Sequence, residues 1–108
     1  MPCVTKIMFD NIAHSDALEL QAREEIQQLE RFFPNLQSCH VTVNVPHKHQ
    51  HHGVKYEVRI HLTVPGAELT VDHQADNDAY VALCDAFVAA RRRLQDFEGR
   101  RRSHKHDE

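Results

Sequence analysis

The sequence has no tryptophan, only three glycines and three cysteines, and no long apolar run. A membrane-spanning helix needs roughly 20 apolar residues, and no stretch of this chain approaches that length. The N-terminus also lacks a signal-peptide pattern, so we expect a cytoplasmic protein without a membrane partner. Cys3, Cys39 and Cys84 are odd in number and have no CxxC spacing, which argues against a disulfide framework and a thiolate zinc site. We interpret them as small buried apolar side chains.

Catalytic signatures are missing as well. The chain contains no GxSxG, Walker loop, GxGxxG or HExxH motif, and no cysteine and histidine pair in a protease-like context. Its acidic residues are scattered over faces that the hydrophobic pattern predicts to be exposed. We therefore expect no enzymatic activity, no catalytic residue, no cofactor and no small-molecule substrate.

The net charge of −3 conceals a strong asymmetry along the 108 residues. Residues 1–90 carry six basic against twelve acidic side chains, a net charge of −6. Residues 91–108 carry seven basic against four acidic side chains, a net charge of +3. Positive charge gathered at one end is compatible with a nucleic-acid partner, despite a slightly acidic chain overall.

The longest predicted helix lies within residues 76–102. Its apolar side chains recur at steps of three and four, which places them on one helical stripe: Tyr80, Leu83, Phe87, Ala90, Leu94 and Phe97. Asp76, Asn77 and Asp78 can cap its first turn, and Gly99 is predicted to end it. Arg91, Arg92 and Arg93 lie in its second half, either as charge that complements the helix dipole or as an anion-binding face.

The remaining chain predicts four strands and one more helix. Residues 3–9 form a strand with Ile7 and Phe9 inward, and a helix capped by Ser15 or Asp16 follows and ends at Pro34. Its apolar stripe consists of Leu18, Ala22, Ile26, Leu29 and Phe33.

Residues 38–45 and 54–64 alternate between apolar and polar side chains, which is typical of half-buried strands. Pro65 and Gly66 signal a turn into a fourth strand with Leu69 and Val71. The order strand, helix, three strands, helix predicts one α+β layer, with both helices on the even-residue face of strand 54–64. We expect one domain over residues 1–99 and a basic, disordered tail over residues 100–108.

A histidine-rich loop lies between the second and third predicted strands. Histidine nitrogens bind zinc, nickel and copper, so a metal-binding or metal-sensing module is an alternative hypothesis; its ligands would be His47, His49, His51 and His52. Partial protonation could also let this loop contact phosphates. A solvated loop without metal is the simpler interpretation.

The arginine cluster is the remaining functional signal. Each guanidinium presents a planar fork of donors to phosphate oxygens, and several together predict salt-sensitive, sequence-independent binding. Because aromatic residues for base stacking are few, recognition of a structured RNA by backbone and shape fits better. A general domain for structured RNA is therefore a second alternative.

Three motifs, in this order and spacing, resemble the ribosome hibernation-promoting factor and ribosome-associated inhibitor family, also called sigma-54 modulation proteins. They are LERFF at residues 29–33, VKYEVRIHLTVPG at residues 54–66, and DAYVALCDAFVAARRRL at residues 78–94. The resemblance implies a β-α-β-β-β-α domain with a four-stranded mixed sheet and two helices on one face, similar to a double-stranded RNA-binding domain. It also implies a short form without the dimerising C-terminal domain.

The resemblance further implies a translation inhibitor that binds rRNA of the small ribosomal subunit, in the mRNA and tRNA channel, and keeps ribosomes inactive under stress. The matching basic positions are Arg23, Arg31, Arg91, Arg92 and Arg93, with Lys55 and Arg59 as secondary candidates. We also expect Arg100, Arg101 and Arg102 to bind rRNA. The first helix is more acidic than this family would predict.

Overall fold

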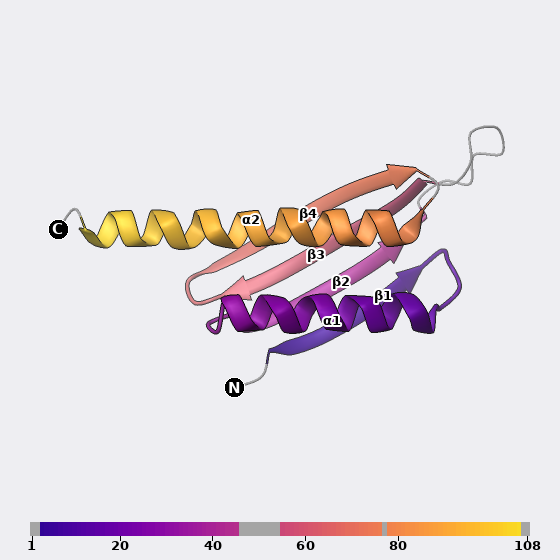
Figure 1. Cartoon of the computed structure of the whole chain (residues 1–108), viewed down its shortest axis with the longest axis horizontal. Coiled ribbons are helices and arrows are strands. Elements are labelled where there is room, and N and C mark those ends of the chain that lie inside the picture. Colours follow the sequence, from indigo (N-terminus) through magenta and orange to yellow (C-terminus); the bar gives the residue numbers. More distant parts are fainter. Residues whose placement is uncertain (1–2, 46–54, 77, 107–108) are drawn as a thin grey trace.

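The computed structural model describes residues 3–45, 55–76 and 78–106, which form four strands and two helices (Figure 1). In chain order these are β1 (Val4–Asp10), α1 (Asp16–Phe32), β2 (Ser38–Asn44), β3 (Lys55–Val64), β4 (Ala67–Asp76) and α2 (Ala79–His106). The predicted α+β class and the order β-α-β-β-β-α are confirmed.

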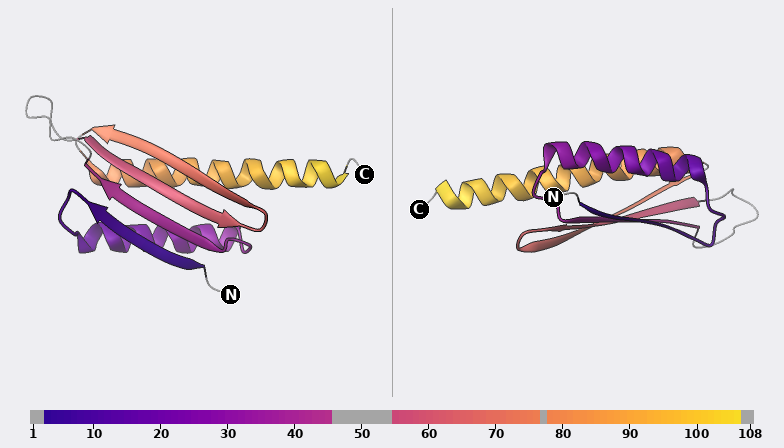
Figure 2. Two further views of the ribbon diagram at one scale, coloured as in Figure 1. Left: turned by 180° about the vertical axis from the view of Figure 1, so that it is seen from behind. Right: turned by 90° about the horizontal axis from the view of Figure 1, so that it is seen from below.

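The strands form one mixed sheet in the order β1-β2-β3-β4. β1 pairs with β2 in parallel, because α1 carries the chain back across the sheet between them. β2, β3 and β4 pair antiparallel, and Gly66 makes the turn from β3 to β4 with a φ of 86°. Both helices lie on one face of this sheet, as Figure 2 shows from below.

The hydrophobic core lies between the helices and that face of the sheet. Val58, Ile60, Leu62 and Val64 of β3 are buried, so its even-numbered residues face the helices as predicted. Leu18, Ala22, Ile26 and Leu29 of α1 and Leu83, Phe87, Ala90 and Leu94 of α2 are buried against them. Ile7, Phe9, Phe33 and Phe97 are partly buried at the margin of this core.

Both helices begin at side-chain caps that the sequence indicates. The Ser15 hydroxyl accepts a hydrogen bond from the backbone N–H of Leu18 at 3.2 Å. The Asp78 carboxylate accepts hydrogen bonds from the N–H groups of Tyr80, at 2.8 Å, and Val81, at 3.4 Å. Such caps satisfy N–H groups that the first helical turn leaves without a backbone partner.

The predicted end of the second helix at Gly99 is wrong. α2 runs through Gly99 to His106, so residues 100–106 are helical rather than irregular. The flanking Glu98, Arg100 and Arg101 are good helix formers, and their preference outweighs the roughly 1 kcal/mol that glycine costs in a helix. The division of the chain into a domain at residues 1–99 and a tail at residues 100–108 stays a prediction.

A substitution of Gly99 can test whether α2 continues through this position. Gly99 has no positive φ, and a Cβ added there would meet no atom within 4 Å. Gly99→Ala is therefore expected to stabilise the last turns of α2 by about 0.5–1 kcal/mol. Amide hydrogen exchange should then slow roughly two- to fivefold after residue 99.

Gly66→Ala is the control and should destabilise the protein, because its φ is positive. Unchanged exchange in the Gly99 variant would contradict a helix that extends through this position.

Cys3 and Cys39 are buried, and all three cysteines are free thiols. Burial raises the pKa of Cys3 to about 11 and that of Cys39 to about 12. Both are therefore protonated at neutral pH and act as small apolar side chains, as the sequence indicated. Cys84 is half-buried, and burial raises its pKa as well.

Candidate nucleic-acid interface

The two helices differ strongly in charge. α1 contains two arginines against five acidic residues, whereas α2 contains seven basic residues against three acidic ones. The basic residues of α2 all lie in its C-terminal part, from Arg91 onward. The last turns of α2 extend past the end of the sheet, which makes them accessible from several sides (Figure 1).

Arg91, Arg92 and Arg93 fan out around α2, since consecutive helical residues are about 100° apart. Arg91 points towards α1 and is half-buried, with its guanidinium carbon 4.8 Å from the centre of the Phe32 ring. At that distance the cation is attracted to the face of the aromatic ring. Arg92 and Arg93 are exposed and line a groove beside β4, together with His73, Asp85 and Asp96.

Glu25 of α1 and Arg91 of α2 line the same groove. Burial raises the pKa of Glu25, and the positive charge of Arg91 opposes this increase. Arg91 therefore contacts an aromatic ring of α1 and lies near a carboxylate of the same helix. Of the three consecutive arginines, Arg92 and Arg93 are the ones with their charge open to solvent.

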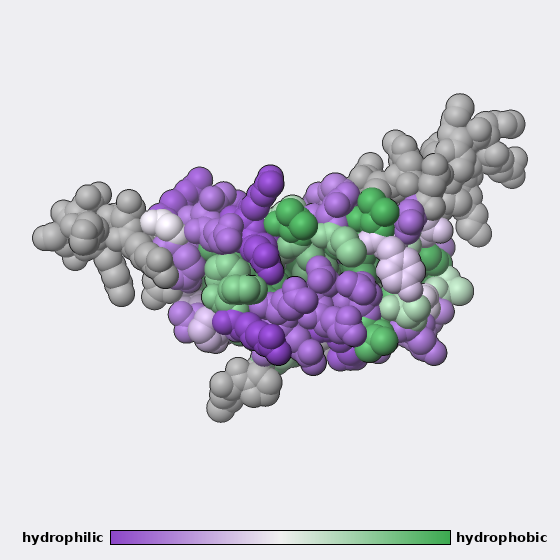
Figure 3. Space-filling view, in the orientation of Figure 1, coloured by the Kyte–Doolittle hydropathy of each residue, from purple (hydrophilic) through white to green (hydrophobic). Residues whose placement is uncertain are grey.

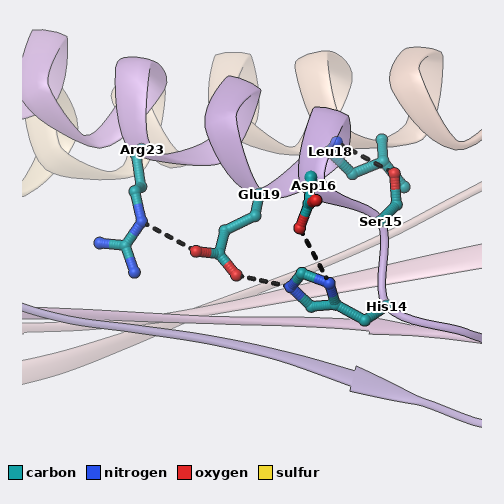
Figure 4. Close-up of polar contacts among 6 residues, drawn as sticks. All are labelled: His14, Ser15, Asp16, Leu18, Glu19 and Arg23. Carbon is teal, nitrogen blue, oxygen red and sulfur yellow. Dashed lines mark hydrogen bonds and ion pairs between the residues drawn. The ribbon is translucent and has the colours of Figure 1, made fainter.

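Arg23 is engaged by its own helix (Figure 4). Its Nε lies 3.2 Å from Glu19 Oε2, and Nε2 of His14 lies 2.8 Å from Glu19 Oε1. The hydrogen bonds from His14 and Arg23 hold the pKa of Glu19 below its usual value. His14 Nδ1 also lies 3.3 Å from Asp16 Oδ1, so this end of α1 carries a mixed-charge cluster. The charge of Arg23 is therefore partly neutralised within α1.

In the described part of the chain, the remaining arginine of α1 does not form an ion pair of the kind that Arg23 forms with Glu19. Arg31 is exposed in the last turn, and it forms no ion pair with any residue that the structure describes. It immediately precedes Phe32, the residue beneath Arg91. Arg100 is exposed on α2, and Arg101 and Arg102 continue the same helix. We define the basic helix edge as Arg31, Arg91, Arg92, Arg93 and Arg100.

The secondary candidates lie elsewhere. Arg59 is on the sheet face opposite the helices, where its Nε lies 2.7 Å from Asp72 Oδ1 of β4. Lys55 begins β3 in register with Asp76. The structure thus separates Arg59 from the basic helix edge by the whole thickness of the domain, and its charge is paired.

The sequence matches the family described as sigma 54 modulation protein / S30EA ribosomal protein over residues 5–102. The chain belongs to this family. The resemblance seen in the three sequence motifs is therefore confirmed. No curated protein matches the sequence.

Two solved structures show the same fold as this S30EA family chain. A ribosomal subunit interface protein from Coxiella burnetii superposes with a TM-score of 0.74 at 13% identity, covering 88% of this chain and 97% of that one. The N-terminal domain of Protein Y from Thermus thermophilus gives 0.72 at 20% identity, covering 89% and 99%. They support the β-α-β-β-β-α architecture over nearly the whole chain.

The sequence did not predict that two aromatic residues of the helices are exposed. Tyr80, predicted on the apolar stripe of α2, is 44% exposed, because Ala82 and Ala86 take buried positions in the first turns instead. Phe32 is 64% exposed. The sequence interpretation assigned Phe33, and not Phe32, to the apolar stripe of the first helix.

Metal binding has no support within the structurally described part of this family member. No group of three or more potential ligands occurs there that could hold a metal ion. The histidine loop with His47, His49, His51 and His52 lies outside the described residues, so that hypothesis stays a prediction. No helix among the residues searched is long and apolar enough to cross a membrane.

Proposed function

We propose that this protein is a ribosome hibernation factor that binds rRNA of the small subunit in the mRNA and tRNA channel and keeps ribosomes inactive under stress. It acts without catalysis, by occupying the space that mRNA and tRNA need. Family membership supports the ribosome as the partner, and one solved structure of the same fold is a ribosomal subunit interface protein.

The observation that carries this proposal is the basic helix edge. It places the exposed guanidinium groups of Arg92, Arg93 and Arg100 on α2, and Arg31 of α1 and the half-buried Arg91 add to them. Arginine forks bind phosphate oxygens in pairs, and several of them in one region suit the backbone of folded RNA. Arg101 and Arg102 would continue this contact, Arg23 would add to it only after leaving Glu19, and Lys55 and Arg59 would contribute least.

Co-sedimentation with purified small ribosomal subunits tests the proposal. Phosphate contacts release counterions, and each contact contributes about −0.7 to −0.9 to the slope of log affinity against log salt. With four to five contacts, affinity should fall by roughly two orders of magnitude between about 50 mM and 200 mM salt. A protein that stays at the top of the gradient at the lower salt concentration would overturn the proposal. Recovery of mainly other RNA after crosslinking in cells would also contradict it.

A further inference from the structure

A groove lies between the end of α1 and residues 95–99 of α2. It has a volume of about 470 Å³ and is lined by Phe32, Phe33, Pro34, Asn35, Gln95, Glu98 and Gly99. In Figure 3 apolar side chains reach the surface between the two helices, among hydrophilic ones. The groove adjoins the basic helix edge but contains none of its arginines.

Phe32 forms one wall of this groove and is held from its other side. Arg91 lies over the Phe32 ring and lines a second groove with Glu25, Gln28 and Val88. The guanidinium contacts the ring, and Phe32 is still 64% exposed. A large, flat apolar surface thus faces solvent beside a row of positive charges.

The other walls of the groove carry two amides and one carboxylate. The amides of Asn35 and Gln95 can donate and accept hydrogen bonds, and the carboxylate of Glu98 accepts them. A carboxylate repels a phosphate, so the interior of the groove does not suit the RNA backbone. It suits the edge of a nucleobase, whose N–H groups can donate to Glu98 while its flat face stacks on an aromatic ring.

We propose that this groove holds one unpaired nucleobase of an RNA strand, stacked on Phe32, while the neighbouring phosphates of that strand contact the basic helix edge. The inference rests on the proposed function, because it takes RNA to be the partner. It adds a preference for RNA with an unpaired base at the contact, which phosphate recognition by arginines does not provide.

Phe32→Leu tests the stacking. Leucine keeps an apolar side chain at an exposed position but removes the aromatic face. Because loss of one stacked base costs about 1–3 kcal/mol, affinity for small ribosomal subunits should fall by roughly tenfold. Phe32→Tyr retains the ring and should bind as the original protein does.

Thermal unfolding of both variants should be nearly unchanged, since Phe32 is mostly exposed. Ultraviolet crosslinking of the complex should join a base to the peptide that begins at Phe32.

The possible results distinguish a failure of the nucleobase site from a failure of the proposed function. A Phe32→Leu variant that binds with unchanged affinity, or a complex without crosslinks to this peptide, overturns the nucleobase site and leaves the proposed function standing. A tenfold loss in both variants also overturns it, because the ring alone then does not account for binding. Failure of the original protein to bind small subunits at low salt is a failure of the proposed function itself.

Discussion

Replacing Arg91, Arg92 and Arg93 together with glutamine is expected to weaken binding to the small ribosomal subunit by about a hundredfold near 0.1 M salt. The estimate assumes three lost phosphate contacts, each worth about 0.7 in log affinity per tenfold change in salt. The slope of log affinity against log salt should become less steep by about 2. Titration of labelled protein against purified subunits at several salt concentrations measures both quantities.

The sheet face offers a control for this variant. Lys6 is exposed on β1 and Arg59 is exposed on β3, and both lie on the face away from the helices. A Lys6→Gln/Arg59→Gln variant also lowers the net charge, but it leaves the basic helix edge intact. It should bind with nearly unchanged affinity. Equal losses in the control and the triple variant would mean that overall charge, rather than the helix edge, determines binding. Circular dichroism should show the same fold in both.

Leu83→Ala is expected to reduce the free energy of unfolding by about 3–5 kcal/mol. Leu83 lies on α2, is fully buried and belongs to the core between the helices and the sheet. Truncation removes buried apolar surface and leaves a cavity that the surrounding strands cannot fill. This loss is a large part of the roughly 5–15 kcal/mol by which small domains are stable. Equilibrium denaturation with urea measures it directly.

The same substitution on α1 provides a matched control. Leu20 is also a helical leucine, but it is 60% exposed, so Leu20→Ala should change stability by less than about 0.5 kcal/mol. Helix propensity changes equally in both variants, and only burial differs. A similar loss for both would contradict the packing of α2 on the sheet. Because α2 carries most of the basic helix edge, Leu83→Ala should also impair RNA binding at temperatures where it unfolds.

Much of the fold could be predicted because its local patterns agree with one another. The alternation through residues 54–64 predicted which side chains of β3 are buried, and the caps at Ser15 and Asp78 marked where the helices begin. The end of α2 could not be predicted from Gly99. A glycine both ends helices and is tolerated within them, and only the surrounding sequence and contacts select between these outcomes.

The candidate site was predictable in composition but not in arrangement. The sequence located the arginines, yet it treated Arg23 and Arg92 as equal candidates and Arg59 as a secondary one. The structure pairs Arg23 with Glu19 and Arg59 with Asp72, while Arg92 remains open to solvent. Ion pairs between strands depend on register, and the Arg59 pair follows from Arg59 lying opposite Asp72 across β3 and β4.

By itself the sequence determined the elements, the buried faces and the concentration of positive charge after residue 90, since periodicity and composition are properties of the chain alone. Only the tertiary structure decided which charges are available and that Phe32 is exposed beside a groove with Arg91 over its ring. These features arise where α1 and α2 meet on the sheet. Contacts between residues about 60 positions apart leave no periodic trace in either segment.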